Sequence, residues 1–187
     1  PELSLVYNSQ NRKDGSPAGY GWDLSIPSIV RENKYGHNRM YTADYESFSS
    51  SIDGPLLSIF GGQYRAKDDA GAFSQYTSVS SAESWELATK NGETYFFGTT
   101  PNSRQHFPLS VSASYLWMLD KMKDANGNEA TYTYFKDQGQ VYLDNFVYMY
   151  ANPPSGNGIF SVHLTWEVRP DVNTTFAPMF RVVTGKR

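Results

Sequence analysis

The sequence predicts an all-β fold, an antiparallel β-sheet or sandwich-like arrangement with hairpins. Aromatic residues make up 16% of the 187 residues, with 14 Tyr, 11 Phe and 4 Trp, and such residues favour the pleated, half-buried surface of a sheet. Two segments also carry an Asn-Gly pair, Asn91-Gly92 and Asn126-Gly127, each followed by β-branched and aromatic residues. An Asn-Gly pair between strand-like segments predicts a tight hairpin turn of type I′. The length suits one large β domain, and we expect a single domain over residues 1–187.

Alternating apolar and polar residues predict the first strands over Glu2–Tyr7 and Asp23–Val30. Pro27 cannot donate to a sheet, so the second of these should be an edge strand or bulged at that point. Glycines and prolines predict a loop over Asn8–Gly21. Residues 32–53 show no clear period, and we expect loops there around a short strand over Arg39–Tyr41.

The rest of the chain alternates between strands and two breaks, at residues 101–108 and 152–158. Tyr115–Met122 also fits a helical stripe, but the Asn-Gly pair and the Thr-Tyr-Thr-Tyr run after it favour a strand. The strands predicted beyond residue 54 are Leu56–Phe60, Gln63–Ala66, Phe73–Val79, Ser84–Thr89, Thr94–Phe97, Tyr115–Met122, Glu129–Phe135, Val141–Met149, Ile159–Val168 and Phe180–Thr184.

Composition argues against several classes of function. The net charge is −3, and no cluster of Lys and Arg forms, so the basic patch of a nucleic-acid binder is missing. No apolar run reaches the length of a transmembrane helix. The chain has no Cys, which excludes disulfides, thiolate metal sites and thiol catalysis. It begins at Pro1, and we expect a fragment of a larger protein.

The ionisable residues give no catalytic pattern. His37, His106 and His163 are far apart and fit no metal-binding spacing. Asp124 opens a segment that resembles a calcium loop, but glycine stands fourth instead of sixth, so a hairpin turn is favoured over weak calcium binding. Asp68-Asp69 could in principle pair with another acidic residue as glycosidase carboxylates, but the sequence does not show two carboxylates at the separation that this chemistry requires. We therefore expect no enzyme activity, no catalytic residues, no cofactor and no metal.

Serines and aromatic residues leave one alternative open. The serines at 47–51 and 78–81 lack the Gly-x-Ser-x-Gly pattern of a nucleophile, and solvated loops account for them. Most aromatic residues should fill a sheet face, because each buries a large area. Tyr20 and Trp22 lie in a Gly-rich loop, and they are the candidate pair for stacking against a glycan.

Several segments resemble one bacterial family. They are Leu5-Val-Tyr-Asn-Ser9, Gly19-Tyr-Gly-Trp-Asp-Leu-Ser-Ile-Pro-Ser-Ile-Val-Arg31, the two Asn-Gly hairpins, and Arg169-Pro-Asp171 leading to Phe180–Arg187. In order and spacing they resemble the N-terminal domain shared by the SpvB virulence proteins and the TcB (TcdB) components of insecticidal toxin complexes, which also heads YD-repeat (Rhs) proteins. Tyr20 departs from the pattern, since a smaller apolar residue is usual there, and the loop between Gly54 and Gly71 looks shorter.

The resemblance implies a noncatalytic structural domain of a secreted, extracellular bacterial toxin or Rhs protein. In toxin complexes such a segment helps build a β shell around a toxic C-terminal part. Its partners would be the following β-propeller or YD-repeat segments of the same polypeptide and other toxin-complex subunits, with no nucleic acid and no membrane span. The alternative is a freestanding β-sandwich module that binds glycans or a cell surface.

Overall fold

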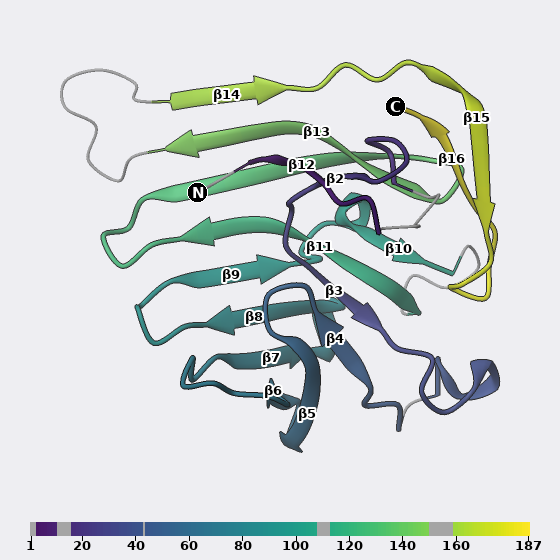
Figure 1. The fold of residues 1–187 in the computed structure, drawn as a ribbon. Helices are drawn as coiled ribbons and strands as arrows, with labels where there is room; N and C mark the ends of the chain where they lie inside the picture. Colours follow the sequence, from purple (N-terminus) through teal and green to yellow (C-terminus); the bar gives the residue numbers. More distant parts are fainter. Residues whose placement is uncertain (1–2, 11–15, 43, 108–112, 150–158) are drawn as a thin grey trace.

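The structure, a computed structural model, describes residues 3–10, 16–42, 44–107, 113–149 and 159–187. In this part of the chain the fold is all-β with antiparallel pairing, as the sequence predicts. Twelve strands form one sheet, flanked by two ribbons (Figure 1). We call β1–β2 the N-terminal ribbon and β15–β16 the C-terminal ribbon. The strands are β1 (Leu5–Tyr7), β2 (Trp22–Leu24), β3 (Ser28–Arg31), β4 (Phe48–Ser50), β5 (Gly54–Phe60), β6 (Gln63–Ala66), β7 (Gln75–Val79), β8 (Ser84–Ala88), β9 (Thr94–Phe97), β10 (Arg104–His106), β11 (Ser114–Lys123), β12 (Glu129–Asp137), β13 (Gln140–Met149), β14 (Ile159–His163), β15 (Val168–Thr175) and β16 (Val182–Lys186).

Eight strands of the large sheet close into a barrel. Their order is β11-β3-β4-β5-β6-β7-β8-β9, and β9 pairs back onto β11. Closure requires β3 and β9 to lie on opposite edges of β11. The peptide between Met118 and Leu119 meets this condition, because its carbonyl accepts from Gly98 N at 2.9 Å while its N–H donates to Pro27 O at 3.0 Å. The two groups of a trans peptide point in opposite directions.

Aromatic side chains fill the barrel. Trp85, 2% exposed, lies with its ring centroid 4.8 Å from Phe48, 5.0 Å from Tyr64 and 5.9 Å from Trp117. These tilted and edge-to-face contacts are the favoured geometry for aromatic pairs. An eight-stranded barrel has an interior just wide enough for side chains, so the aromatic richness of the sequence becomes a packed core.

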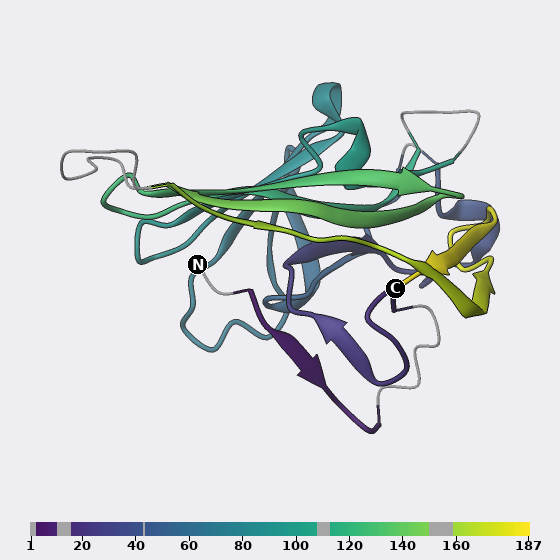
Figure 2. The same ribbon diagram turned by 90° about the horizontal axis from the view of Figure 1, so that it is seen from above.

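Beyond β11 the sheet leaves the barrel and continues through β12, β13 and β14, as the view from above shows (Figure 2). β10 pairs with the first half of β11. The C-terminal ribbon joins this extension through Val183 N, which donates to Gln138 O at 3.0 Å. The barrel therefore carries an open sheet on one side, and the C-terminal ribbon packs against that sheet.

The two predicted hairpins form, but their turn type differs from the prediction. β8 joins β9 and β11 joins β12 at the two Asn-Gly pairs. Gly92 and Gly127 have φ of 80° and 83°, whereas neither Asn has a positive φ. Gly92 N donates to Thr89 O and Gly127 N to Asp124 O. Each is thus a type I turn followed by a left-handed glycine, because the loop has three residues and not two.

Three strand predictions near the N-terminus are wrong in detail. Asp23–Val30 splits into β2 and β3, which belong to different sheets, because the chain turns before Pro27, where Ile26 N donates to Leu24 O. The short strand predicted over Arg39–Tyr41 does not form, because Arg39 ends a 3-10 helix, η1 (His37–Arg39), and Met40 and Tyr41 lie in the turn after it. Strand β4 falls among serines predicted as solvated loop, and Ser50 is buried there.

The C-terminal predictions also need correction. Ile159–Val168 ends as a strand at His163, and Val168 instead begins β15, which pairs with β16. β16 starts at Val182 and not at Phe180. The break at residues 101–108 contains a 3-10 helix, η3 (Pro101–Ser103), and β10. The predicted strand Tyr115–Met122 is confirmed within β11, and the break at residues 152–158 lies outside the described residues.

Candidate functional site

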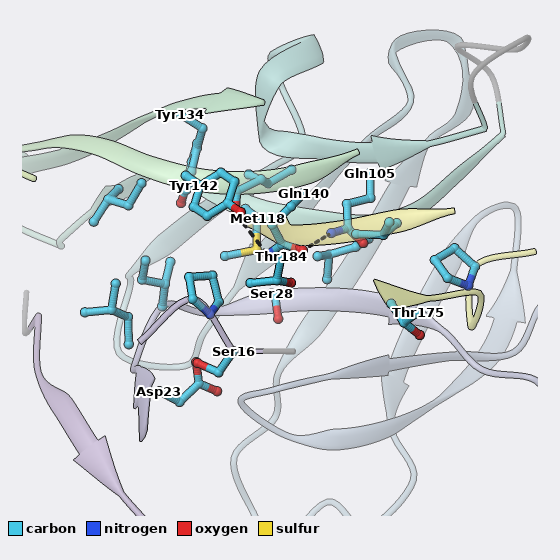
Figure 3. Close-up of a pocket in the computed structure, with 18 of the residues that line it drawn as sticks. Ser16, Asp23, Ser28, Gln105, Met118, Tyr134, Gln140, Tyr142, Thr175 and Thr184 are labelled. Atoms are coloured by element: carbon cyan, nitrogen blue, oxygen red, sulfur yellow. Dashed lines mark hydrogen bonds between the residues drawn. The ribbon is translucent and has the colours of Figure 1, made fainter. Parts of the chain in front are cut away.

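A cavity of about 580 Å³ lies between the sheet extension and the two ribbons (Figure 3). We call it the cavity. Its lining combines apolar and aromatic side chains with hydroxyls and side-chain amides. The residues that line it are Ser16, Pro17, Asp23, Leu24, Ile26, Ser28, Gln105, Tyr115, Leu116, Met118, Tyr134, Gln140, Val141, Tyr142, Leu143, Trp166, Asn173, Thr174, Thr175, Ala177, Pro178, Val182 and Thr184.

Tyr142 and Trp166 form an aromatic wall whose geometry is fixed by hydrogen bonds. Tyr142, on β13, accepts at its hydroxyl from Gly185 N at 3.1 Å and Lys186 N at 3.2 Å. Trp166 donates from Nε1 to Leu143 O at 2.7 Å. The two rings meet edge to face with centroids 5.0 Å apart. These bonds tie the C-terminal ribbon to the sheet and hold both rings in place.

Two side-chain amides meet at the cavity wall. Gln105, buried on β10, donates from Nε2 to Gln140 Oε1 at 3.1 Å, and Gln140 donates in turn to Val141 O at 3.3 Å. Figure 3 shows this pair and Tyr142 on one side of the cavity, with Ser16 and Asp23 on the other. The polar groups thus come from parts of the chain that are far apart in sequence.

Arg169 connects the two ends of the chain near the cavity. Its side chain is 3% exposed, and its Nη1 donates to Ser16 O at 3.1 Å. The other guanidinium nitrogens bind Asp171 at 2.8 and 3.1 Å. Hydrogen bonding to Arg169 lowers the pKa of Asp171 to about 2. A bidentate pair of this kind fixes orientation as well as charge, so Arg169 holds the loop at Ser16 against the C-terminal ribbon.

The described residues of the cavity lining place no histidine beside a nucleophile. Asp23 is the one carboxylate among them, and Ser16 Oγ lies 3.4 Å from its Oδ1. Burial raises the pKa of Tyr134 well above its ordinary value, and its hydroxyl donates to Leu119 O at 2.6 Å. That phenol therefore stays neutral around pH 7. Such a lining presents hydrogen-bonding groups and apolar surface to a ligand.

The structure keeps the three predicted histidines on separate elements. His37, on η1, has its Nε2 3.0 Å from Asn33 Nδ2. His106, the last residue of β10, has its Nδ1 3.1 Å from Phe107 O. His163, the last residue of β14, has its Nδ1 3.6 Å from Asp144 Oδ1. Among the described residues, no group of three or more His, Cys, Asp and Glu side chains is placed to hold a metal ion.

The other acidic candidates have local structural partners. Asp124 accepts from Asn126 N at 2.8 Å and from Asn128 N at 2.9 Å within the hairpin turn, and hydrogen bonding to Asn128 lowers its pKa. Asp69 accepts from Gly71 N and Phe73 N, both at 3.1 Å. The segment from Asp124 is therefore the hairpin turn that the sequence favours.

Tyr20 and Trp22 lie on the N-terminal ribbon and its loop, away from the aromatic wall of the cavity. Tyr20 is 57% exposed and Trp22 is 40% exposed. Trp22 packs against its cross-strand neighbour Tyr7, with centroids 5.0 Å apart and planes tilted by 50°. Gly21 makes this possible, because a Cβ there would lie 2.8 Å from Tyr7 Cε2. Tyr7, which sequence reasoning did not single out, is the ring that Trp22 contacts.

Two charged side chains, the half-buried Arg31 and the buried Asp120, were given no structural role by the sequence. Arg31 places its guanidinium 5.1 Å from the ring centroid of Phe48 and 5.4 Å from that of Trp117, and burial lowers its pKa. Asp120 accepts from Ser103 Oγ at 2.9 Å and Thr100 Oγ1 at 3.1 Å, and burial raises its pKa. Both residues lie in strand-like segments. A single charged residue among apolar ones is the feature of the sequence that could have pointed to them.

No helix in the described part of the chain has the length and apolar character needed to cross a bilayer. No curated protein sequence matches the chain significantly.

Solved structures show the same fold. The N-terminal domain of the effector protein SpvB from Salmonella typhimurium strain LT2 matches with a TM-score of 0.80 and 16% identity, over 100% of this chain and 80% of that one. The Tc holotoxin pore of Photorhabdus luminescens matches with a TM-score of 0.79 and 17% identity, and the TcdB2-TccC3-Cdc42 complex with 0.77 and 17%. This chain is fully covered in both but spans only 12% of those chains.

A family model adds sequence evidence to the shared fold. The model for the Salmonella virulence plasmid 65kDa B protein matches residues 1–155, which is most of the chain. The resemblance drawn from the sequence motifs is thus confirmed, and the chain belongs to the SpvB family.

Proposed function

We propose that residues 1–187 form one noncatalytic structural domain of a secreted bacterial toxin or YD-repeat (Rhs) protein. The observation that carries the proposal is the recurrence of the whole fold as 12% of the much longer chains in toxin-complex structures. The proposed role is to help build a shell around a toxic C-terminal part. Its proposed partners are β-propeller or YD-repeat segments of the same polypeptide and other toxin-complex subunits.

The outer strand of the sheet extension supports such a role. β14 lies at the end of the sheet, and β13 is its hydrogen-bonded neighbour. Val162 pairs with Phe146 and Phe160 pairs with Tyr148, so each pair shares one face of the sheet. Phe146 is buried, whereas Val162 is 48% and Phe160 64% exposed. The apolar face therefore extends beyond the part that the described residues bury.

The C-terminal ribbon has a similar outer surface. Val168 is 75%, Val172 55% and Phe176 64% exposed, while Val182 and Thr184 of the same ribbon are buried against the sheet. Large exposed apolar surface marks sites of contact with other protein segments, and an open strand edge invites pairing. A scaffold domain held among neighbours in a larger polypeptide accounts for both.

Cysteine labelling tests whether neighbours cover these surfaces. The chain has no Cys, so Phe160→Cys and Val172→Cys each introduce one thiol into it. In the full-length parent protein we expect both thiols to react much more slowly with a maleimide than in the 187-residue chain alone. Gln63→Cys, at an exposed position on the barrel strand β6, is the matched control and should react equally fast in both.

Equal labelling rates in the parent and in the isolated chain, at both apolar positions, would contradict the scaffold proposal. Protection of the control thiol as well would indicate burial of the entire domain, without a specific contact at β14. Detection of the parent outside the producing bacteria tests the proposed secretion separately.

A second candidate function, glycan or surface binding at Tyr20 and Trp22, is favoured by the exposed Tyr7–Trp22 pair. Aromatic faces of this kind can stack on a flat apolar group. Trp22→Ala should then abolish any shift of Trp fluorescence on adding cell-surface oligosaccharides, while Tyr35→Ala, an exposed ring on another loop, should preserve it. Absence of a fluorescence response in the unmodified chain would remove this candidate.

A further inference from the structure

The cavity has properties that a purely structural role does not require. Its volume of about 580 Å³ lies within the range of small-molecule sites. Fixed aromatic rings and paired amides line it. We infer that the cavity binds a small neutral ring that carries hydroxyl groups, such as a monosaccharide or another cyclic polyol.

Charge in the lining selects against ionic ligands. Among the described residues that line the cavity there is no Lys, Arg or His, and Asp23, the one carboxylate among them, is itself exposed to solvent. Moving an anion out of water without a cation to pair it costs several kcal/mol. Asp23 would also repel an anion. A neutral ligand avoids this cost.

The polar side chains of the lining suit hydroxyl groups. Gln105 and Gln140 contribute amides, and Ser28, Thr175 and Thr184 contribute hydroxyls (Figure 3). Amides and hydroxyls each contain a donor and an acceptor, and so does every hydroxyl of a polyol. These groups come from β3, β10, β13 and the C-terminal ribbon, so they can reach different positions around one ring.

The aromatic wall supplies apolar surface beside these polar groups, and the half-buried Trp166 is its more accessible ring. Tyr142 and Trp166 are held by hydrogen bonds to the backbone at 2.7 to 3.2 Å. Side chains that are fixed before binding lose little entropy when a ligand arrives. The wall and the amides together give the amphipathic lining that a sugar ring requires.

Titration followed by amide NMR tests the inference on the unmodified 187-residue chain. The probes are methyl glucoside, methyl galactoside, N-acetylglucosamine and myo-inositol, each at up to tens of millimolar. At least one should shift the amide signals of Gln105, Gln140 and Thr184. Glucuronate, which adds a carboxylate, and cyclohexanol, which removes all but one hydroxyl, should shift them less at the same concentration.

Gln140→Leu should weaken binding by about tenfold, the loss expected for one polar partner. Gln63→Leu, on an exposed strand position outside the cavity, should leave binding unchanged. The inference is overturned if none of the four probes shifts the cavity signals, if the shifts map to Tyr20 and Trp22 instead, or if cyclohexanol binds as well as the sugars. Each of these results leaves the labelling test of the scaffold proposal unaffected.

Discussion

The barrel and the N-terminal ribbon are both rich in aromatic and aliphatic residues, but they differ in where those side chains lie. In the barrel, Trp85 and Phe97 are almost completely buried, because closure gives every strand two neighbours. In the ribbon, Leu5, Val6 and Tyr7 are each about half exposed, because two strands alone cannot cover both of their faces. The same residue types therefore stabilise one region from within and leave the other dependent on contacts outside it.

The largest effect is expected when an aromatic side chain is removed from the interior of the barrel. Trp85→Ala removes a side chain that contacts Phe48, Tyr64 and Trp117, and we expect it to lower the free energy of unfolding by about 3–5 kcal/mol. Trp22→Ala, at the 40% exposed ribbon position, should cost less than about 1 kcal/mol. Urea unfolding measures both. Similar losses would mean that the ribbon is as tightly packed as the barrel.

A glycine pair tests how tightly the barrel closes. In Gly98→Ala the new Cβ would lie 2.2 Å from Trp117 Cδ1 at a φ of +65°, so we expect a loss of about 2–4 kcal/mol from overpacking and backbone strain together. Gly54 has a φ of +73° with no atom within 4 Å of the Cβ position. Gly54→Ala should therefore cost only about 1 kcal/mol of strain. Thermal unfolding of both variants at one pH measures the difference in stability. Equal losses would mean that the positive φ alone causes the loss and that the contact with Trp117 adds nothing.

The link at Arg169 tests the coupling between the chain ends. Arg169→Met leaves Ser16 O without its donor, and we expect a loss of about 1–2 kcal/mol in local stability. Hydrogen exchange should quicken at Ala18 and in the C-terminal ribbon, while the barrel amide of Leu87 keeps its protection. Lys121→Met, which removes an exposed ion pair on β11, is the control. Faster exchange throughout the barrel would show that the chain ends stabilise it globally.

The C-terminal ribbon and the barrel should respond to acid in opposite directions. The folded pKa of Asp171 is lowered from 3.8 to about 2, so its contribution to stability is present above pH 3.8 and disappears as the pH falls toward about 2. The pKa of Asp120 is raised by burial, so its protonation favours the fold, and this contribution is lost as the pH rises through its folded pKa. NMR at stepwise lower pH should show loosening of the C-terminal ribbon before β11. If β11 loosened before the C-terminal ribbon, the stabilising effects assigned here to Asp171 and Asp120 would be wrong.

The sequence predicted the fold class and most strands because aromatic alternation and Asn-Gly pairs report local geometry. It missed β4 because Phe48 is the one large apolar residue in a run of serines, and only pairing with β3 and β5 makes that run a strand. It also missed the closure of the barrel, which depends on β3 pairing with β11 across a long stretch of chain.

The candidate site was predicted less well than the fold. Tyr142 and Trp166 lie far apart in sequence, and neither stands in a recognisable motif. The cavity forms only when β13 and the two ribbons come together, so no local pattern encodes it. Tyr20 and Trp22 were found because a Gly-rich loop and exposed aromatic residues are local features.

The position of β11 in the barrel has a consequence for the order of folding. Val30 of β3 pairs with Leu116 of β11. The strand β3 is synthesised early, so it has no partner on this edge until β11 has been synthesised much later. Long-range pairing of this kind slows folding and leaves strand edges exposed in the meantime. The edge of β3 that pairs with β11 therefore stays uncovered during translation until residues 116–118 have been made, and until then it is open to chaperones or to another nascent chain.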